Sequence, residues 1–353
     1  MSKSALIMAG GTGGHIFPGL ALAEALRGCG WRVHWLGNAK GMEGELVPAR
    51  GFAFEHIDFM GVRGKGLMTL ALLPLRLLKA FWQSLAVVRR VGPQVVVGLG
   101  GYITFPGGMM SVLLGKPLVL HEQNSVAGMA NKVLAGVADR VYTAFPEVLA
   151  KGQWVGNPLR SAFLQQAAPE LRFAQRSGPL RLLVVGGSLG ARALNDTVPQ
   201  ALALIPADQR PLVLHQSGAR QLQALQTAYA SAGVHAELTP FIEDTAQAFA
   251  QADLVICRAG ASTVTEIAAV GAAALFVPFP FAVDDHQTHN ARYLTDRGAG
   301  ILLDQRALTA EHLAGLLQGL NRATLLDWAQ RAHQLKKTEA TQALVDACEE
   351  LAR

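Results

Sequence analysis

The sequence predicts an α/β protein with two similar domains, each built on a parallel β-sheet that helices cover. The chain has 353 residues, which is enough for about two domains. Short apolar segments alternate with helical segments along the chain, which is typical of parallel sheets. A glycine-rich turn follows the first apolar segment of each half, at Gly10–Gly14 and again at Gly186–Gly190, so the second half repeats the plan of the first.

Composition excludes several classes of protein. The three cysteines, Cys29, Cys257 and Cys348, lie far apart, which argues against a zinc site or a disulfide framework and fits a reducing compartment. The apolar start of the chain runs directly into glycines, so we expect a first strand there and not a signal peptide. No stretch reaches the roughly 18 apolar residues of a transmembrane helix.

Charge is distributed unevenly. Residues 1–163 contain 16 Lys and Arg against 8 Asp and Glu, whereas residues 164–353 contain 15 against 18. A basic first half predicts an anionic partner. The sequence has no dense Lys/Arg run and no aromatic-rich strand, which argues against nucleic acid as that partner. An anionic membrane surface fits better.

The first half begins with an expected strand at 5–9, followed by Gly10-Gly11-Thr12-Gly13-Gly14-His15 and a helix through about Cys29. Only glycine lets the backbone turn this tightly and approach a ligand this closely, so the turn indicates a phosphate or nucleotide site. It matches neither the P-loop pattern nor the full GxGxxG pattern. The next expected strand, 31–36, ends in Gly37-Asn38, without the acidic residue that holds a nicotinamide ribose.

Residues 61–91, after an expected strand at 52–58, form an unusually apolar segment. Four polar residues recur in it at helical spacing: Arg76, Lys79, Gln83 and Arg90. A broad apolar face beside basic residues suits an interfacial helix, because the apolar side chains enter lipid while Lys and Arg meet anionic head groups. The alternative is a core helix whose polar stripe faces water. Residues 61–74 are the better membrane candidate.

Two further polar or glycine-rich turns complete the first half. Gly98-Leu99-Gly100-Gly101-Tyr102 follows an expected strand at 95–97 and is a second potential diphosphate cradle. His121-Glu122-Gln123-Asn124 follows a strand at 118–120 and precedes a helix from about Gly128, where polar side chains are well placed for ligand contact or proton transfer. A strand at 141–143 is expected to end this sheet, and residues 156–160 (GNPLR) are the expected domain link.

The second half restarts with a strand at 181–185 and the turn Gly186-Gly187-Ser188-Leu189-Gly190-Ala191. Further strands are expected at 212–215, 235–239, 254–256, 273–277 and 300–303. Two helical segments, about 309–336 and 338–352, close the chain.

The stretch from 252 to 291 carries the strongest ligand signal. Thr263-Val264-Thr265-Glu266 fits a capping box before an apolar helix, and a helix N-terminus suits a phosphate. The polar loop 284–290 follows the next strand and therefore lies at the same carboxyl edge of the sheet. We expect a diphosphate at the helix start and a polyhydroxylated group at the loop. The alternative is that Glu266 only caps its helix and the loop is only solvated.

Six motifs occur in a fixed order over nearly the whole chain: GGTGGHIFP, GLGGY, HEQN, GNPLR, GGSLGA, and GAST-x-TE followed by DDHQ-x-x-NA. With them the sequence resembles the MurG family of bacterial glycosyltransferases (glycosyltransferase family 28), which add N-acetylglucosamine to lipid I, undecaprenyl-pyrophosphoryl-N-acetylmuramyl-pentapeptide, in peptidoglycan synthesis. The resemblance implies a GT-B fold, in which two Rossmann-like domains face each other across a cleft and the last helix crosses back to the first domain.

The resemblance also implies a division of labour. Residues 1–160 and 337–353 would hold the lipid acceptor and face the membrane, and residues 161–336 would hold UDP-N-acetylglucosamine. The enzyme would need no cofactor and would lie peripherally on the cytoplasmic face of the inner membrane. Cell-wall synthesis and division proteins would be candidate partners.

Carried over onto matching positions, the resemblance implies particular site residues. The donor contacts would be Thr12, Gly13, Gly14, Asn124, Arg160, Ser188, Ile242, Ala261, Ser262, Thr263, Val264, Thr265, Glu266 and Gln287. The acceptor contacts would be Gly10, Gly11, Gly98, Gly100, Gly101 and Tyr102. Glu266 would hold the ribose, the backbone of Ile242 the uracil, and Gln287 the sugar. Leu189 stands where the family usually has Gln, and Ser262 where Leu is common, so altered donor affinity is expected.

The expected reaction is a direct, inverting attack of the muramyl C4 hydroxyl on the donor's anomeric carbon. His15 is the first candidate for the general base and Glu122 the second, although His15 could instead only bind substrate or stabilise its turn. Asp284 and Asp285 are adjacent and no DxD motif occurs, so no metal is expected. Three alternatives stay open: a diacylglycerol glycosyltransferase, a UDP-N-acetylglucosamine 2-epimerase, and a nucleotide-binding protein without transferase activity.

Overall fold

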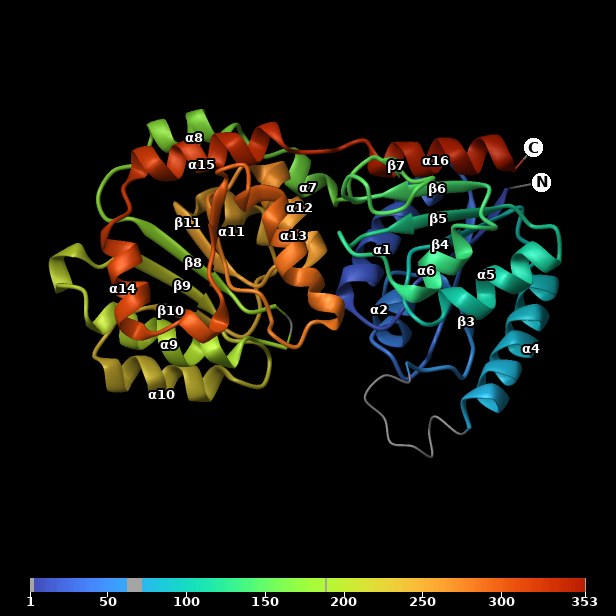
Figure 1. Cartoon of the computed structure of the whole chain (residues 1–353), viewed down its shortest axis with the longest axis horizontal. Coiled ribbons are helices and arrows are strands. Elements are labelled where there is room, and N and C mark those ends of the chain that lie inside the picture. The colour runs from blue at the N-terminus through green and yellow to red at the C-terminus, as the bar shows by residue number, and fades with distance from the viewer. Residues whose placement is uncertain (1–2, 62–71, 188, 353) are drawn as a thin grey trace. The chain divides into compact units, whose positions relative to one another are not determined.

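The computed structural model describes residues 3–61, 72–187 and 189–352, and the chain divides into two compact units. The first unit comprises Met1–Arg160 and Thr338–Arg353, and the second comprises Ser161–Lys337. Each contains one sheet of parallel strands with helices on both faces (Figure 1). This confirms the predicted α/β class.

The first unit is built on a seven-stranded sheet in the order β3-β2-β1-β4-β5-β6-β7. Its strands are β1 (Ser4–Met8), β2 (Arg32–Gly37), β3 (Ala53–His56), β4 (Val95–Gly98), β5 (Leu118–Glu122), β6 (Arg140–Thr143) and β7 (Gln153–Trp154). Its helices are α1 (Gly13–Gly28), α2 (Glu43–Ala49), α4 (Leu73–Val91), α5 (Thr104–Leu113), α6 (Met129–Leu134) and α16 (Ala340–Leu351). The strand order reverses between β1 and β4, and ligands bind at such switch points in open α/β sheets.

Alternation along the strands divides the core of this unit into two layers. Ile7 and Val97 belong to a cluster with α1 and α16, whereas Leu6 and Met8 belong to a cluster on the other face, with α4 and α5. Successive side chains of a strand point to opposite faces, so apolar runs without polar interruptions are required here. Figure 1 shows α16, at the red end of the chain, within the first unit.

The second unit is built on a six-stranded sheet in the order β10-β9-β8-β11-β12-β13. Its strands are β8 (Arg181–Val185), β9 (Leu212–Gln216), β10 (Glu237–Thr239), β11 (Leu254–Cys257), β12 (Ala274–Phe276) and β13 (Gly300–Leu302). Its helices are α7 (Ser161–Leu164), α8 (Pro169–Ala174), α9 (Arg192–Ala203), α10 (Leu222–Ala232), α11 (Thr245–Gln251), α12 (Ala261–Val270), α13 (His286–Thr295), α14 (Ala310–Gln318) and α15 (Arg322–Gln334), with short 3-10 turns η1 (Ala207–Gln209), η2 (Val283–Asp285) and η3 (Gln305–Ala307).

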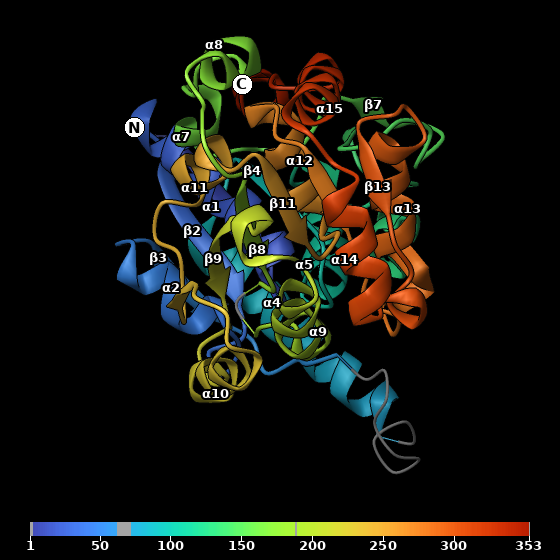
Figure 2. The ribbon, with the colours of Figure 1, turned by 90° about the vertical axis from the view of Figure 1, so that its left-hand side faces the viewer.

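Helices cover both faces of the second sheet. Helices α9, α10 and α14 pack together, and α12 packs against α11, α13 and α15. Figure 2 shows α9 and α10 on one side of β8 and β11, and α12 and α15 on the other. The strand order reverses between β8 and β11, so the second unit repeats the switch point of the first.

The predictions for the end of the first sheet and for the segment 309–336 are wrong. The first sheet does not end at 141–143, because the short strand β7 pairs in parallel with β6. The segment 309–336 is not one helix, because α14 ends at Gln318 and α15 starts after Asn321. Asn321 caps the new helix, with its Oδ1 accepting from the Thr324 amide at 3.0 Å.

Helix α4 leaves three large apolar side chains exposed, although its Ala80, Val87 and Val88 are buried in the core. Leu75, Leu78 and Trp82 are 66%, 66% and 71% exposed. The polar residues turn instead toward the end of β3: Lys79 pairs with Asp58 at 2.7 Å, and the Gln83 Oε1 accepts from the Asp58 amide at 2.9 Å. The ion pair with Lys79 lowers the pKa of Asp58. Residues 62–71 of the predicted membrane tip lie outside the described residues.

Candidate functional site

The two glycine-rich turns of the first unit lie against each other at the switch point. A Cβ on Gly101 would lie 2.3 Å from the Gly10 carbonyl oxygen, so no side chain fits between the turns. Gly100 and Gly101 also have φ values of +91° and +84°, a backbone region that favours glycine. Gly98 is spatially restricted too, because its Cβ would lie 2.5 Å from the Thr104 Cγ2.

His15 lies in the first turn of α1, on the exposed side of this site. Its Nδ1 lies 2.8 Å from the Gln123 Oε1, and the ring is half-buried. Thr12 is the N-cap of α1, and its side chain makes no capping hydrogen bond. The Gly13 and Gly14 amides are the first two of the helix, where no preceding helical carbonyl is available to them. The start of α1 therefore presents N–H donors beside an imidazole.

The second candidate base, Glu122, is buried and fully engaged. It is 1% exposed. Its Oε1 accepts from the Asn124 amide at 2.9 Å, and its Oε2 accepts from the Gly128 amide at 3.0 Å and from the Asn131 Nδ2 at 2.9 Å. A carboxylate so placed stabilises the loop and the start of α6. Asn124 itself is half-buried beside it.

Glu43 is a buried acidic residue of this site that sequence reasoning missed. Its Oε2 accepts from the Gly11 amide and its Oε1 from the Asn38 amide, both at 3.2 Å. The Gly11 amide is therefore engaged by Glu43 in this structure. Tyr102 lies beside Gly11, and burial, with Glu43 nearby, raises the pKa of its phenol to about 12.

In the second unit a pocket of about 790 Å³ opens at the switch point between β8 and β11. This volume falls in the usual range for small-molecule sites. Its lining comes from the Gly186–Arg192 turn, the start of α12 and the loop after β12, and it includes Thr263 and Gln287. Ser188 lies outside the described residues, and Leu189 is exposed at the pocket.

The predicted capping box at Thr263–Glu266 is wrong. Helix α12 begins two residues earlier, at Ala261, after an extended Gly260, and no side chain caps it. Thr265 instead donates its hydroxyl to the Ala261 carbonyl at 3.0 Å. The uncapped start leaves helical N–H groups directed at the pocket, which suits an anion.

The remaining predicted donor residues differ in what they can offer. Val264 is fully buried and Ala261 nearly so, which restricts any ligand contact by these two residues to the backbone. Glu266 and Ser262 are half-buried. Ile242 lies in the loop after β10, with its carbonyl accepting from the Thr245 hydroxyl at 3.4 Å. Arg160 ends the first of the two segments that make up the first unit.

The prediction of a polar loop over 284–290 is wrong for most of its length: Asp284 and Asp285 precede α13, whereas residues 286–290 form the first turns of that helix. Asp284 and Asp285 have φ values of +53° and +49°, which is strained for non-glycine residues. The Gln287 Oε1 accepts from the Phe279 amide at 2.9 Å, and the buried Asn290 donates to the Ala259 carbonyl at 3.2 Å. These bonds fix the start of α13 to the segments after β12 and before α12. Within the described residues the Gln287 Nε2 makes no hydrogen bond, which leaves it for a ligand.

Arg258 is a pocket residue that the sequence did not single out. Its guanidinium donates to the carbonyls of Val277 and Pro278 and, at 2.7 Å, to the Gln305 Oε1. Burial lowers the pKa of Arg258. A cation fixed in this way contributes positive potential to the pocket.

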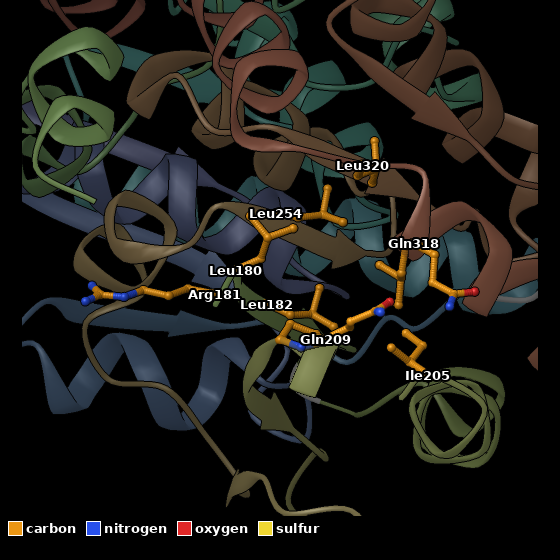
Figure 3. A pocket seen from close by; sticks show the side chains of 10 residues that line it. Leu180, Arg181, Leu182, Ile205, Gln209, Leu254, Gln318 and Leu320 are labelled. Carbon is orange, nitrogen blue, oxygen red and sulfur yellow. The ribbon is translucent and has the colours of Figure 1, made fainter. Parts of the chain in front are cut away.

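A second cavity lies at the opposite, amino end of β8 and β11. It has about 240 Å³ and a lining rich in leucine. Figure 3 shows Leu180, Leu182 and Leu254 grouped in it, with Arg181 extending away from them. It adjoins no glycine-rich turn, so it is not part of the candidate site. In the described part of the chain, no group of three or more His, Cys, Asp or Glu residues is placed to hold a metal ion.

Comparisons with known proteins agree with this architecture. The model of the glycosyltransferase family 28 N-terminal domain matches residues 5–143, and that of the C-terminal domain matches residues 181–346. A solved structure of Acinetobacter baumannii MurG is 41% identical and superposes with a TM-score of 0.86, covering 99% of both chains. The glycosyltransferase of kitacinnamycin, at 15% identity and a TM-score of 0.74, shares the fold.

Two curated relatives are similar over their full lengths. One from Paracidovorax citrulli is 72% identical and covers 99% of this chain and 98% of its own. One from Polaromonas naphthalenivorans is 72% identical and covers 99% of both. Each is named a UDP-N-acetylglucosamine–N-acetylmuramyl-(pentapeptide) pyrophosphoryl-undecaprenol N-acetylglucosamine transferase. The predicted resemblance is confirmed, and the chain belongs to the MurG-type glycosyltransferases of family 28.

Proposed function

We propose that this enzyme transfers N-acetylglucosamine from UDP-N-acetylglucosamine to the C4 hydroxyl of the muramyl sugar of lipid I, with inversion, giving lipid II for peptidoglycan synthesis. The observation that carries the proposal is the pocket of about 790 Å³ at the switch point of the second unit, where helical N–H groups and Gln287 converge. Relatives at 72% identity bear the name of this activity.

The two units take different substrates in this proposal. The second unit (Ser161–Lys337) binds the donor: the Gly186–Ala191 turn with Ser188 and the start of α12 bind the diphosphate, Glu266 the ribose, the Ile242 backbone the uracil and Gln287 the sugar. In the first unit, the two glycine turns together cradle the pyrophosphate of lipid I. Thr12, Gly13, Gly14, Asn124 and Arg160 complete the donor contacts.

The reaction is a single displacement. The acceptor C4 oxygen forms its bond to the anomeric carbon while the bond from that carbon to the β-phosphate oxygen breaks, and UDP departs with the bonding electrons. His15 removes the hydroxyl proton as general base. The start of α12, Ser188 and Arg160 stabilise the charge that develops on the leaving diphosphate. No metal takes part in this scheme.

His15 is preferred to Glu122 because their surroundings differ. The His15 ring is half-buried at the start of α1, while Glu122 is buried and accepts hydrogen bonds on both oxygens. With saturating substrates, His15→Ala should lose most of its kcat, by about 10²-fold or more. Near-normal turnover in that variant would remove His15 from this role.

The test of the proposed function is UDP release from UDP-N-acetylglucosamine, with and without a short-chain lipid I analogue, in the presence of a chelator. Release that depends on the analogue, together with formation of the disaccharide, supports the reaction, its substrates and its independence of metal. Donor hydrolysis without transfer, or activity that only Mg²⁺ restores, contradicts the corresponding part. Formation of UDP-N-acetylmannosamine without release of UDP would indicate an epimerase instead.

We also propose that the enzyme lies peripherally on the anionic cytoplasmic face of the inner membrane, through the exposed apolar side of α4. Leu75, Leu78 and Trp82 supply the apolar contact, and Arg76 lies among them in sequence. Within the described residues no helix is long and apolar enough to cross a bilayer. Cell-wall synthesis and division proteins are the partners that this location suggests, and co-purification from crosslinked membranes tests them.

A further inference from the structure

A chain of hydrogen bonds runs behind His15 into the core of the first unit. The His15 Nδ1 lies 2.8 Å from the Gln123 Oε1, and the Gln123 Nε2 lies 3.0 Å from the His121 Nδ1. The His121 Nε2 lies 2.8 Å from the carbonyl oxygen of Gly156. His121 and Gln123 are both fully buried. Three of the sequence motifs, GGTGGHIFP, HEQN and GNPLR, thus meet in one chain of contacts.

The far end of this chain sets the direction of every bond in it. A carbonyl oxygen only accepts, so the His121 Nε2 must carry a proton and donate it to Gly156. Burial lowers the pKa of His121 to about 4, so the ring is neutral and its Nδ1 holds a lone pair. That lone pair requires a donor, which is the Gln123 amide nitrogen.

The orientation of the Gln123 amide has independent support. Its Nε2 also donates to the His121 carbonyl oxygen at 3.2 Å, which a flipped amide could not do. Its Oε1 therefore faces the His15 Nδ1 and must accept from it. The proton of a neutral His15 consequently resides on Nδ1, and its lone pair resides on Nε2. The same Nδ1–H bond persists when the ring becomes an imidazolium.

Packing holds the His15–Gln123 contact in place. A Cβ on Gly100 would lie 2.9 Å from both the Cε1 and the Nδ1 of His15, and 3.3 Å from the Gln123 Oε1. The glycine turn after β4 thus closes over this hydrogen bond. Among the described residues, none makes a hydrogen bond to the His15 Nε2, so that nitrogen is available to a ligand.

We propose that Gln123 and His121 are positioning residues that lock His15 in the Nδ1–H tautomer, so that Nε2 is the atom that takes the acceptor's hydroxyl proton. The role resembles that of a carboxylate behind a catalytic histidine, which fixes tautomer and ring orientation. Here the partner is a neutral amide, which orients the ring without adding charge. The inference rests on the proposed function for the identity of the proton, but the tautomer can be measured without any substrate.

The first experiment is ¹H–¹⁵N NMR of the whole protein labelled at histidine nitrogen, with the His15 signals identified by their loss in His15→Ala. We expect His15 to be in the Nδ1–H form in the wild-type protein. In Gln123→Met, which keeps the side-chain size but removes all three of its hydrogen bonds, the Nε2–H form should appear. A wild-type His15 in the Nε2–H form, or an unchanged tautomer in Gln123→Met, overturns the proposal.

Kinetics of the same variants supply the second readout. Gln123→Met should lower kcat by about 10²-fold, the low end for loss of a general base, with little change in the KM for UDP-N-acetylglucosamine. Gln123→Glu keeps an acceptor opposite the His15 Nδ1 but loses the donor to His121, so it should recover only part of that loss. The matched control is Gln94→Met, which removes a hydrogen bond to the Ser4 amide elsewhere in the same unit and should keep its kcat.

These readouts separate the two proposals. An Nδ1–H tautomer that depends on Gln123, in an enzyme that fails to use lipid I, would contradict the proposed function while the tautomer lock stands. Equal kcat in Gln123→Met and Gln94→Met would show that Gln123 positions nothing that catalysis needs.

Discussion

At the scale of single residues, the site of the first unit depends on side chains that are widely separated in sequence. His15 and Gln123 are 108 residues apart, and Gly11 and Glu43 are 32 apart. The glycines of the site could be predicted, because tight turns with positive φ leave a recognisable pattern. Glu43 could not, because its role comes from two backbone amides that only the fold brings together.

We predict that Gly101→Ala destabilises the first unit far more than Gly115→Ala. Both positions have positive φ, so each alanine costs about 1–2 kcal/mol of backbone strain. A Cβ at position 101 would also lie 2.3 Å from the Gly10 carbonyl oxygen, whereas position 115 has nothing within 4 Å. The total for Gly101→Ala should therefore reach about 3 kcal/mol or more. Urea unfolding of the two variants measures the difference, and equal costs would mean that the turns separate without penalty.

At the scale of secondary structure, the orientation of α4 leads to a test of membrane binding. Changing Leu75, Leu78 and Trp82 to Gln should reduce binding to anionic vesicles by about tenfold or more, since each buried apolar side chain contributes about 1.5–3 kcal/mol on transfer. Folding should be unaffected because these side chains are exposed. Vesicle co-sedimentation at two salt concentrations measures the binding.

The matched control for α4 is Leu171→Gln, at a leucine of the second unit that is 64% exposed. It should bind vesicles like the wild-type protein. If both variants bind equally well, α4 is not the membrane contact. Loss of binding accompanied by a lower unfolding midpoint in the α4 variant would show that the helix face packs against the protein after all.

Sequence reasoning found nearly every strand but misplaced two helix starts, for different physical reasons. At α12 the hydroxyl and carboxylate spacing of a capping box occurs within the helix. The helix starts earlier, after the N-cap residue Gly260, which has extended φ and ψ values of −60° and 147°. Between α14 and α15 the apolar periodicity continues through Leu320 and Leu325. This continuity hid two signals, Gly319 as the C-cap of α14 and Asn321 as the N-cap of α15.

At the scale of the whole molecule, buried neutral histidines predict how stability responds to acid. Burial lowers the pKa of His121 to about 4 in the first unit and that of His215 to about 3 in the second. In the unfolded chain a histidine has a pKa near 6.5, so it takes up a proton at a higher pH than the buried ring does. The contribution of each neutral histidine to the free energy of unfolding is therefore present above pH 6.5 and is lost as the pH falls toward 4 or 3. Between pH 6.5 and 5 each unit should lose about 2 kcal/mol, at about 1.4 kcal/mol per pH unit.

Hydrogen exchange of peptides from β9, measured at pH 7 and pH 5 and corrected for intrinsic exchange, tests this for the second unit. His215→Gln should flatten the pH dependence there, although it weakens contacts to Tyr229 and Asn195. The exposed His312→Gln should leave the dependence unchanged. An equally steep dependence in His215→Gln would exclude His215 as its source.

The last helix links the end of the chain to the core of the first unit, and its removal should affect the two units unequally. Leu344 and Cys348 of α16 are fully buried in the same cluster as Trp31, and the Trp31 Nε1 donates to the Glu349 Oε1 at 2.6 Å. Deleting residues 338–353 would expose this cluster, and even Leu344→Ala should cost about 2–5 kcal/mol.

The donor pocket should survive that deletion, because all of its lining residues lie between Val185 and Gln305, within the second unit. We therefore expect the truncated protein to bind UDP with nearly unchanged affinity by calorimetry, while proteolysis degrades the first unit and transfer to a lipid I analogue is lost. Loss of UDP binding would mean that the donor site depends on the first unit for more than Thr12, Gly13, Gly14, Asn124 and Arg160 can explain. Retained transfer would mean that α16 is not needed to keep the glycine turns and His15 in their working arrangement.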